Sequence, residues 1–272
     1  MMPPSLCARI ALPAETGGSD ASLIGRELRG IDELRAAAAL YAHVFQYESA
    51  DFALNLNLLS ALTQNGGSAV GVFTEQEELV GFAYGFAGCD VGGQEFHYSQ
   101  AATVDPRFQG RGVGRTLKHL QAQVAARWGH RSMRWTFDPL LAKNAHFNFS
   151  SLGASGIAYR TDYYERPGTD RILVEWNLDA ERRLLDRGTR AFRTPPRLDR
   201  SDWAIPRTDD DAVWVALPAT PPTGAEAAEL RPRLAEALSA ALGEGRQLIA
   251  CPRLSDTTSA YLAVPDRPKE TR

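Results

Sequence analysis

Three glycines at every second position stand out in residues 109–115, which read QGRGVGR. The run EFHYSQAATV (95–104) before them alternates like a strand, and Val113, Leu117 and Leu120 after them begin a helical pattern. Backbone N–H groups can reach an anion at such a turn, because glycine has no Cβ and the first N–H groups of a helix have no partner. The stretch therefore predicts a phosphate-binding loop.

Known phosphate-binding loops differ in their spacing. A dinucleotide loop, GxGxxG, begins directly after a strand and needs an acidic residue about 20 positions on. Here a loop intervenes and residue 130 is a histidine, and the pattern GxxxxGK[ST] is absent. Gln109, Gly112 and Gly114 instead fit Q/R-x-x-G-x-G/A, the pattern of an acyl-CoA pyrophosphate loop. An ordinary glycine-rich turn before a surface helix is the alternative.

With this motif in this context, the chain resembles the GCN5-related N-acetyltransferase (GNAT) superfamily over roughly residues 22–178. The resemblance implies an α/β fold, in which a mixed and mostly antiparallel sheet is flanked by helices. It implies direct transfer of an acyl group from acetyl-CoA or another acyl-CoA, such as succinyl-CoA, to a primary amine. The cofactor-binding residues that it implies are Ala102, Thr103, Val104, Gln109, Gly110, Arg111, Gly112, Val113, Gly114, Arg115, Asn144 and Asn148.

Three basic residues near the loop have two interpretations. Arg111, Arg115 and Lys118 lie away from the stripe that Val113 and Leu117 begin. They either contact the phosphates of CoA or form a solvated face.

The general base departs from the superfamily pattern. Many relatives carry a glutamate eleven positions before the first residue of the motif, and counting back from Gln109 gives Tyr98. Tyrosine is a poor base at neutral pH unless it acts through water. His97 has a more suitable pKa, but it points to the other face of a regular strand. Glu48 or Asp51, between the first two helices, is a further alternative.

The general acid is also open. Relatives often place a tyrosine on the helix after the fifth strand, where this chain has Phe147 and Phe149. Tyr163 and Tyr164 follow the next strand, and Tyr164 is the favoured candidate.

A narrower resemblance rests on MRWTFDPLLAKNAHFNFSSLGA (133–154) and on TDYYERPGTDR (161–171). Both are similar to acyltransferases with a C-terminal extension, some of which are linked to N-succinylation of amino acids. The resemblance implies a small amino-acid acceptor, whose carboxylate would involve Asp170 and Arg171. An ion pair that holds a strand is the alternative for these two residues.

The hydrophobic periodicity and the turn signals predict four regions. They are a flexible N-terminus (1–21), the GNAT domain (22–180), an Arg/Pro-rich linker (181–210) and a small β-α-β-β module (211–265). The helix of that module is expected near 232–242, with Pro232 at its first position. We read the module as structural or as an edge for dimerisation.

Composition limits the partners. A formal charge of −3 over 272 residues argues against a nucleic-acid-binding protein, and the three cysteines are far apart, as is common in the cytoplasm. No histidine spacing predicts a metal site, and no apolar run predicts a membrane span or a signal peptide. We therefore expect a cytoplasmic enzyme with a small-molecule amine acceptor, and consider a homodimer. The alternative function is an acyl-CoA-binding protein that does not catalyse transfer.

Overall fold

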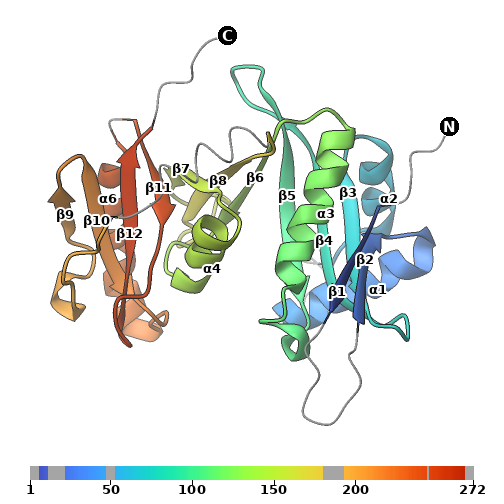
Figure 1. Ribbon diagram of the computed structural model, residues 1–272, viewed down its shortest axis with the longest axis horizontal. Helices are drawn as coiled ribbons and strands as arrows, with labels where there is room; N and C mark the ends of the chain where they lie inside the picture. The colour runs from blue at the N-terminus through green and yellow to red at the C-terminus, as the bar shows by residue number, and fades with distance from the viewer. Residues whose placement is uncertain (1–5, 12–21, 47–52, 180–192, 244, 267–272) are drawn as a thin grey trace. The chain divides into compact units, whose positions relative to one another are not determined.

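The structure is a computed structural model that describes residues 6–11, 22–46, 53–179, 193–243 and 245–266 (Figure 1). Backbone contacts divide the chain into two compact units, Met1–Met133 and Arg134–Arg272.

The first unit contains an antiparallel sheet with the strand order β1-β2-β3-β4-β5. Its strands are β1 (Cys7–Ala11), β2 (Ser22–Glu27), β3 (Ser68–Phe73), β4 (Leu79–Cys89) and β5 (Glu95–Val104). The bounds of β5 confirm the sequence prediction. The expectation of a flexible N-terminus (1–21) is wrong for residues 7–11, because they form strand β1.

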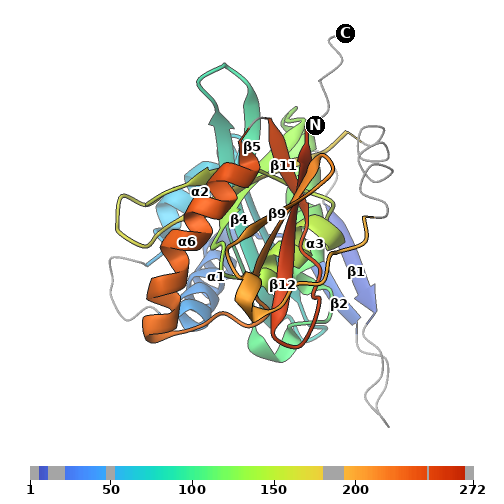
Figure 2. The same ribbon diagram turned by 90° about the vertical axis from the view of Figure 1, so that its left-hand side faces the viewer.

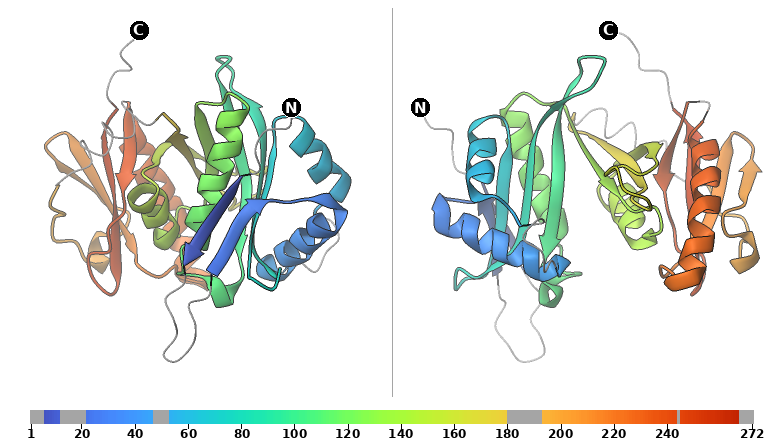
Figure 3. Two further views of the ribbon diagram at one scale, coloured as in Figure 1. Left: turned by 45° about the vertical axis from the view of Figure 1, so that its right-hand side comes forward. Right: turned by 180° about the vertical axis from the view of Figure 1, so that it is seen from behind.

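Helices cover both faces of this sheet (Figure 3). Helices α1 (Gly30–Phe45) and α2 (Leu56–Gln64) pack on one face, where Leu34 and Leu59 join Phe82 in a buried cluster. Helix α3 (Val113–Arg127) packs on the other face, where Leu117 and Leu120 join Val70 and Val72. These two clusters are the core of the first unit.

Small residues on β4 let α3 lie close to the sheet. Gly81, Ala83 and Gly85 alternate with larger side chains and leave one face of the strand small. A Cβ added at Gly81 would lie 2.6 Å from Val113 Cγ1, so the start of α3 fits there only against a glycine. The loop before α3 is thereby held against β4.

Strand β5 contains a β-bulge at Gln100. Tyr84 of β4 pairs with Ala101, but the next β4 residue, Gly85, pairs with Ser99, so Gln100 has no partner across the ladder. A bulge of this kind bends a strand and leaves the extra residue outside the ladder.

The second unit begins with β6 (Ser132–Phe137), α4 (Ala142–His146), the π-helical turn η3 (Phe147–Ser151), β7 (Ser155–Arg160) and β8 (Arg171–Asn177). The short 3-10 turn η4 (Arg200–Asp202) follows, with β9 (Pro206–Asp209), β10 (Ala212–Pro218), α6 (Gly224–Leu242), β11 (Arg246–Ala250) and β12 (Thr258–Pro265). The strand order is β6-β8-β7-β11-β12-β10-β9. The C-terminal strands thus extend the sheet, since β11 pairs with β7 at Leu248 and Gly156.

Helix α6 packs against β7, β10 and β11 (Figure 2). Its buried stripe includes Leu230, Leu234 and Leu238. The predicted start at Pro232 is wrong, because α6 begins at Gly224 and Pro232 lies inside the helix. The stripe continues through Leu230 on the N-terminal side of the proline, and this burial outweighs the one backbone hydrogen bond that a proline removes.

The predicted fold class is confirmed: helices flank a mixed, mostly antiparallel sheet that C-terminal strands extend. Of the predicted linker, the structure describes residues from 193 onward, which include β9. None of the helices in the described segments is long and apolar enough to cross a bilayer.

Candidate active site

The loop between β5 and α3 is held by hydrogen bonds at its first residues. The Asp105 N–H donates to Val80 O at 2.9 Å, and the Asp105 carboxylate accepts from Arg107 N at 2.9 Å and Arg107 Nη2 at 2.7 Å. Arg107 also lowers the pKa of Asp105 through these bonds. Beyond the 3-10 turn η2 (Pro106–Phe108), Gln109 Nε2 donates to Val104 O at 3.3 Å. The motif glutamine therefore ties the loop to the end of β5.

The glycines of the loop have the backbone that an anion site needs. Gly110 and Gly112 have φ of 77° and 84°, a left-handed conformation that favours glycine. A Cβ at either position would meet nothing within 4 Å, so the space in front of both is open. Gly112 is the N-cap of α3, and the fully packed Val113 anchors the first turn, in which Gly114 is the second residue. These residues fit a phosphate group at the first N–H groups of the helix.

The three basic residues near the loop separate into two kinds. Arg111 and Arg115 are exposed, and the Arg111 guanidinium lies 5.8 Å from the centroid of the Phe108 ring. Lys118 is 5% exposed, and its Nζ donates to Ser99 Oγ at 2.8 Å. The prediction for Lys118 is therefore wrong: it lies directly after Leu117 on the helix face that packs on β5. Burial lowers the pKa of Lys118 to about 7.

The two candidate bases on β5 lie on opposite faces of the sheet, as the sequence predicts. Tyr98 pairs with Phe86, and their ring centroids are 5.3 Å apart. His97 lies on the α3 face, fully buried, with Nε2 2.9 Å from Ser68 Oγ. Burial, together with the neighbouring His130 and Lys118, lowers the pKa of His97 to about 4. The histidine is therefore uncharged at neutral pH and engaged on the face away from Tyr98.

The end of β5 offers backbone and small side chains. Ala102 is exposed, while Thr103 is buried and its Oγ1 donates to Phe82 O at 3.4 Å. Val104 is half-buried, and its carbonyl accepts from Gln109. Residues 102–104, which the resemblance implies for binding the thioester, therefore lie two to four positions after the bulge at Gln100.

Two asparagines of the second unit differ in burial. Asn148, in the π-helical turn, is buried, and its Oδ1 accepts from Trp135 Nε1 at 3.1 Å. Asn144 is exposed on α4. Asn144 is therefore the more accessible of the two for a pantetheine amide.

Tyr164 lies in an ordered turn between β7 and β8. Asp170 holds this turn, since its carboxylate accepts from Tyr159 Oη at 2.7 Å and from the Asp162 N–H at 3.0 Å. Burial and the bond to Asp170 raise the pKa of Tyr159 far above its usual value. Tyr164 is 37% exposed, and the Arg171 guanidinium lies 5.0 Å from its ring centroid. The candidate acid Tyr164, in the turn, thus lies close to the guanidinium of Arg171, the half-buried first residue of β8.

The candidate residues form one set in each unit. Tyr98, residues 102–104 and residues 109–115 belong to the first unit, whereas Asn144, Asn148 and Tyr164 belong to the second. The alternative bases Glu48 and Asp51 lie outside the described residues.

The sequence interpretation missed a row of hydrogen-bonded side chains beneath β5. Ser99 Oγ donates to Gln121 Oε1 at 2.7 Å, and Gln121 Nε2 donates to Ser68 Oγ at 3.2 Å. With the bond from Lys118 to Ser99 and that between Ser68 and His97, the five residues form what we call the buried polar chain. The position of Gln121, four residues after Leu117 on α3, is the signal that could have revealed it.

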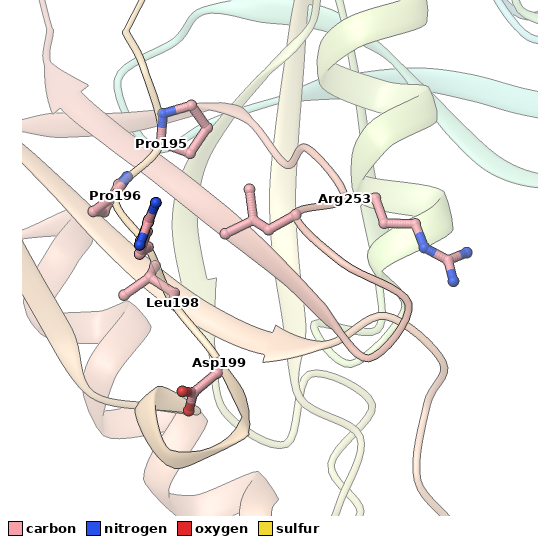
Figure 4. A pocket seen from close by; sticks show the side chains of 7 residues that line it. Pro195, Pro196, Leu198, Asp199 and Arg253 are labelled. Carbon is pink, nitrogen blue, oxygen red and sulfur yellow. The ribbon is translucent and has the colours of Figure 1, made fainter.

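A shallow cavity of about 490 Å³ lies in the second unit, and its lining includes Pro195, Leu198 and Arg253 (Figure 4). The prolines line one side, and the Arg253 guanidinium points away from them. None of the candidate site residues lines this cavity. Within the described segments, no three His, Cys, Asp or Glu residues are grouped to hold a metal ion.

Comparison with known proteins gives one family. Residues 31–149 match the model of the Acetyltransferase (GNAT) family. No curated protein matches the chain.

Several solved structures are similar, each over 58% of this chain. A protein from Salmonella typhimurium, solved with its cofactor acetyl-CoA, is 20% identical over 95% of its own chain, with a TM-score of 0.49. Phosphinothricin acetyltransferase from Sinorhizobium meliloti, in complex with acetyl-CoA, is 17% identical over 88% of its chain (TM-score 0.45). The ribosomal-protein-S18-alanine N-acetyltransferase from Escherichia coli is 18% identical over 94% of its chain (TM-score 0.43).

The family match covers α1 to η3, including the loop and the start of α3 that the motif predicts. Over these residues the chain is similar to the acetyltransferases of that family.

Proposed function

We propose that this protein is an N-acyltransferase that moves an acetyl or succinyl group from an acyl-CoA to a primary amine of a small molecule. The observation that carries the proposal is the loop of residues 109–114, with two left-handed glycines at the start of α3 and open space in front of both. Such a loop can bind the pyrophosphate of CoA through backbone N–H groups. Arg111 and Arg115 supply exposed positive charge beside it.

The chemistry follows from the reactants. The acceptor amine, an ammonium ion at neutral pH, must first lose a proton. Its nitrogen then attacks the thioester carbon to give a tetrahedral intermediate, which loses one further proton from nitrogen as the C–S bond breaks. The amide is thereby formed, and the leaving thiolate takes up a proton to become free CoA. A backbone N–H near residues 102–104 would stabilise the oxyanion, and binding both substrates together supplies much of the acceleration.

We assign the proton transfers to two tyrosines. Tyr98 would act through a bound water that takes the proton of the amine, since His97 is held on the opposite face. Tyr164 would protonate the leaving thiolate. If this is correct, Tyr98→Phe lowers kcat at least tenfold, with little change in the KM of acyl-CoA. An unchanged kcat would contradict the role of Tyr98.

The amino-acid acceptor and the succinyl donor rest on the narrower sequence resemblance. Arg171, the first residue of β8 and close to the Tyr164 ring, is suited to bind a carboxylate of either substrate. An acyl-CoA panel against L- and D-amino acids, followed by release of free thiol, tests both. We propose a structural role for the C-terminal module. A homodimer is also proposed, and measurement of the molar mass by light scattering tests it.

Binding of CoA can be separated from backbone strain with two matched variants. Gly112→Glu places a carboxylate and a Cβ in the loop, whereas Gly129→Glu makes the same change at the other end of α3, where φ is 87°. We expect calorimetry to show loss of CoA binding in the first variant and an affinity within threefold of wild type in the second. Equal binding by both variants, or no binding by the wild type, would refute the proposal.

The non-catalytic alternative makes a different prediction. It expects acyl-CoA binding that depends on Gly112 but no thiol release with any amine. Turnover that Gly112→Glu abolishes would exclude it.

A further inference from the structure

The buried polar chain is an unusual core. Lys118, Ser99, Gln121, Ser68 and His97 are each 0–5% exposed, although they lie between a helix and a sheet that are otherwise apolar. Burying polar groups is unfavourable unless each is hydrogen-bonded, and burying an amine is especially so. An apolar α3 face would pack here without that cost, so the buried polar chain is expected to serve a purpose other than stability.

The hydrogen bonds of the buried polar chain run in one direction. The Lys118 amine donates to Ser99, whose own proton goes to the carbonyl oxygen of Gln121. The Gln121 amide donates to Ser68, whose hydroxyl lies 2.9 Å from His97 Nε2. Because a carbonyl only accepts and an amide NH₂ only donates, each link fixes the next.

The buried polar chain also lies beneath the bulge of β5. Ser99 directly precedes Gln100, the residue without a partner on β4. Gly85, opposite Ser99, leaves the space that the buried polar chain occupies. A Cβ at Gly85 would lie 2.6 Å from His97 Nε2 and 3.2 Å from Gln121 Nε2. The side chain of Ser99 is thus bonded to Lys118 and Gln121 of α3, and Gln121 is in turn bonded to Ser68 of β3.

We propose that the buried polar chain is a positioning device, which sets the backbone of the β5 bulge and thereby the N–H groups of residues 102–104, which the proposed function places at the acyl group. This inference deepens the proposed function and rests on it for the identity of the ligand. Ser99, Gln121 and Lys118 are positioning residues, since they act through the β5 backbone. None of them is required to touch the substrate.

Two substitutions test the links nearest the bulge. Ser99→Ala removes the hydroxyl between Lys118 and Gln121, while Ser99→Thr keeps it. Ser132→Ala is the matched control, because Ser132 Oγ is buried in a strand and has no hydrogen-bond partner among the described residues. We expect Ser99→Ala to lower kcat at least tenfold with the KM of acyl-CoA within threefold, Ser99→Thr to retain most of kcat, and Ser132→Ala to match wild type.

Lys118→Met separates positioning from stability. It replaces a buried amine with an apolar side chain of similar length, so we expect a higher melting temperature together with a lower kcat. A loss of activity caused by unfolding would lower both. A kcat that is unchanged in Lys118→Met and in Ser99→Ala would overturn the proposal.

Hydrogen exchange tests the bulge without any substrate. In the free protein, the amides of residues 99–102 are expected to exchange at least tenfold faster in Ser99→Ala and Gln121→Leu than in wild type or Ser132→Ala. Unchanged exchange would overturn the link between the chain and the bulge. If the wild type neither binds nor uses acyl-CoA, the proposed function fails. Hydrogen exchange still decides in that case whether the buried polar chain holds the bulge.

Discussion

Replacing Lys118 by methionine should stabilise the protein, and the gain should depend on pH. The structure buries the amine so fully that its pKa falls from 10.5 to about 7. Between these two values the unfolded chain binds more protons than the folded one, so the free energy of unfolding of the wild type rises with pH across this window. Below the folded pKa, both states are protonated and the contribution is constant.

The magnitude follows from the shift. A lowering of about 3.5 pKa units makes the buried amine unfavourable by about 4 kcal/mol at pH 7. Losing the hydrogen bond to Ser99 offsets about 1 kcal/mol of this. We therefore expect Lys118→Met to unfold with a free energy about 3 kcal/mol higher than wild type at pH 7. By pH 9 the difference should have shrunk by about 2 kcal/mol, because the wild-type amine is neutral in the folded state there.

Urea unfolding followed by circular dichroism at pH 6, 7, 8 and 9 measures both quantities. Titrations common to both proteins cancel in the difference between the variant and wild type. Lys143→Met, an exposed lysine on α4, is the control and should show no difference that depends on pH. The reasoning is refuted if Lys118→Met is less stable than wild type at pH 7, or if the difference does not shrink towards pH 9.

Three further outcomes are expected. Gly85→Ala should lower the free energy of unfolding by about 2 kcal/mol or more, measured with urea, because its Cβ would lie 2.4 Å from Tyr98 O; an unchanged midpoint would contradict the packing. Pro232→Ala should raise the melting temperature of the second unit in calorimetry, since it restores an N–H inside α6 and is worth up to about 3 kcal/mol. A lower melting temperature would show that the proline is needed. His97 should stay uncharged in an NMR titration until about pH 4, so its contribution to stability falls as pH drops from 6.5 towards 4; a midpoint near 6.5 would disprove its burial.

Strand alternation and the glycine pattern were sufficient to predict β5, the loop after it and the start of α3 in the first unit. Strand β5 has the bounds that the sequence predicts, Glu95–Val104. Counting back from Gln109 identified Tyr98, and the strand period of two placed His97 on the opposite face. Local periodicity carries this information without any knowledge of tertiary contacts.

The errors arose where tertiary burial overrides a local signal. Pro232 is a common first residue of a helix, yet the apolar stripe of α6 extends through Leu230 before it. Lys118 was read as a surface cation because lysine is rarely buried, and only its contacts with Ser99 reveal the polar core. A network of single polar residues on β3, β5 and α3 has no spacing rule, so sequence alone could not predict it.

The pairing of β11 with β7 affects how the protein can be shortened. A chain cut after β8 would keep the segment that matches the family, but β7 would become an open edge of the sheet. Unpaired strand edges recruit other chains, so such a fragment is expected to aggregate rather than to remain monodisperse. The edge strand at the C-terminal end of the sheet, β9, instead carries Pro206, Arg207 and Asp209 on four exposed residues. Proline and charge make β9 a poor template for further pairing, and the C-terminal strands thereby protect the solubility of the sheet that they complete.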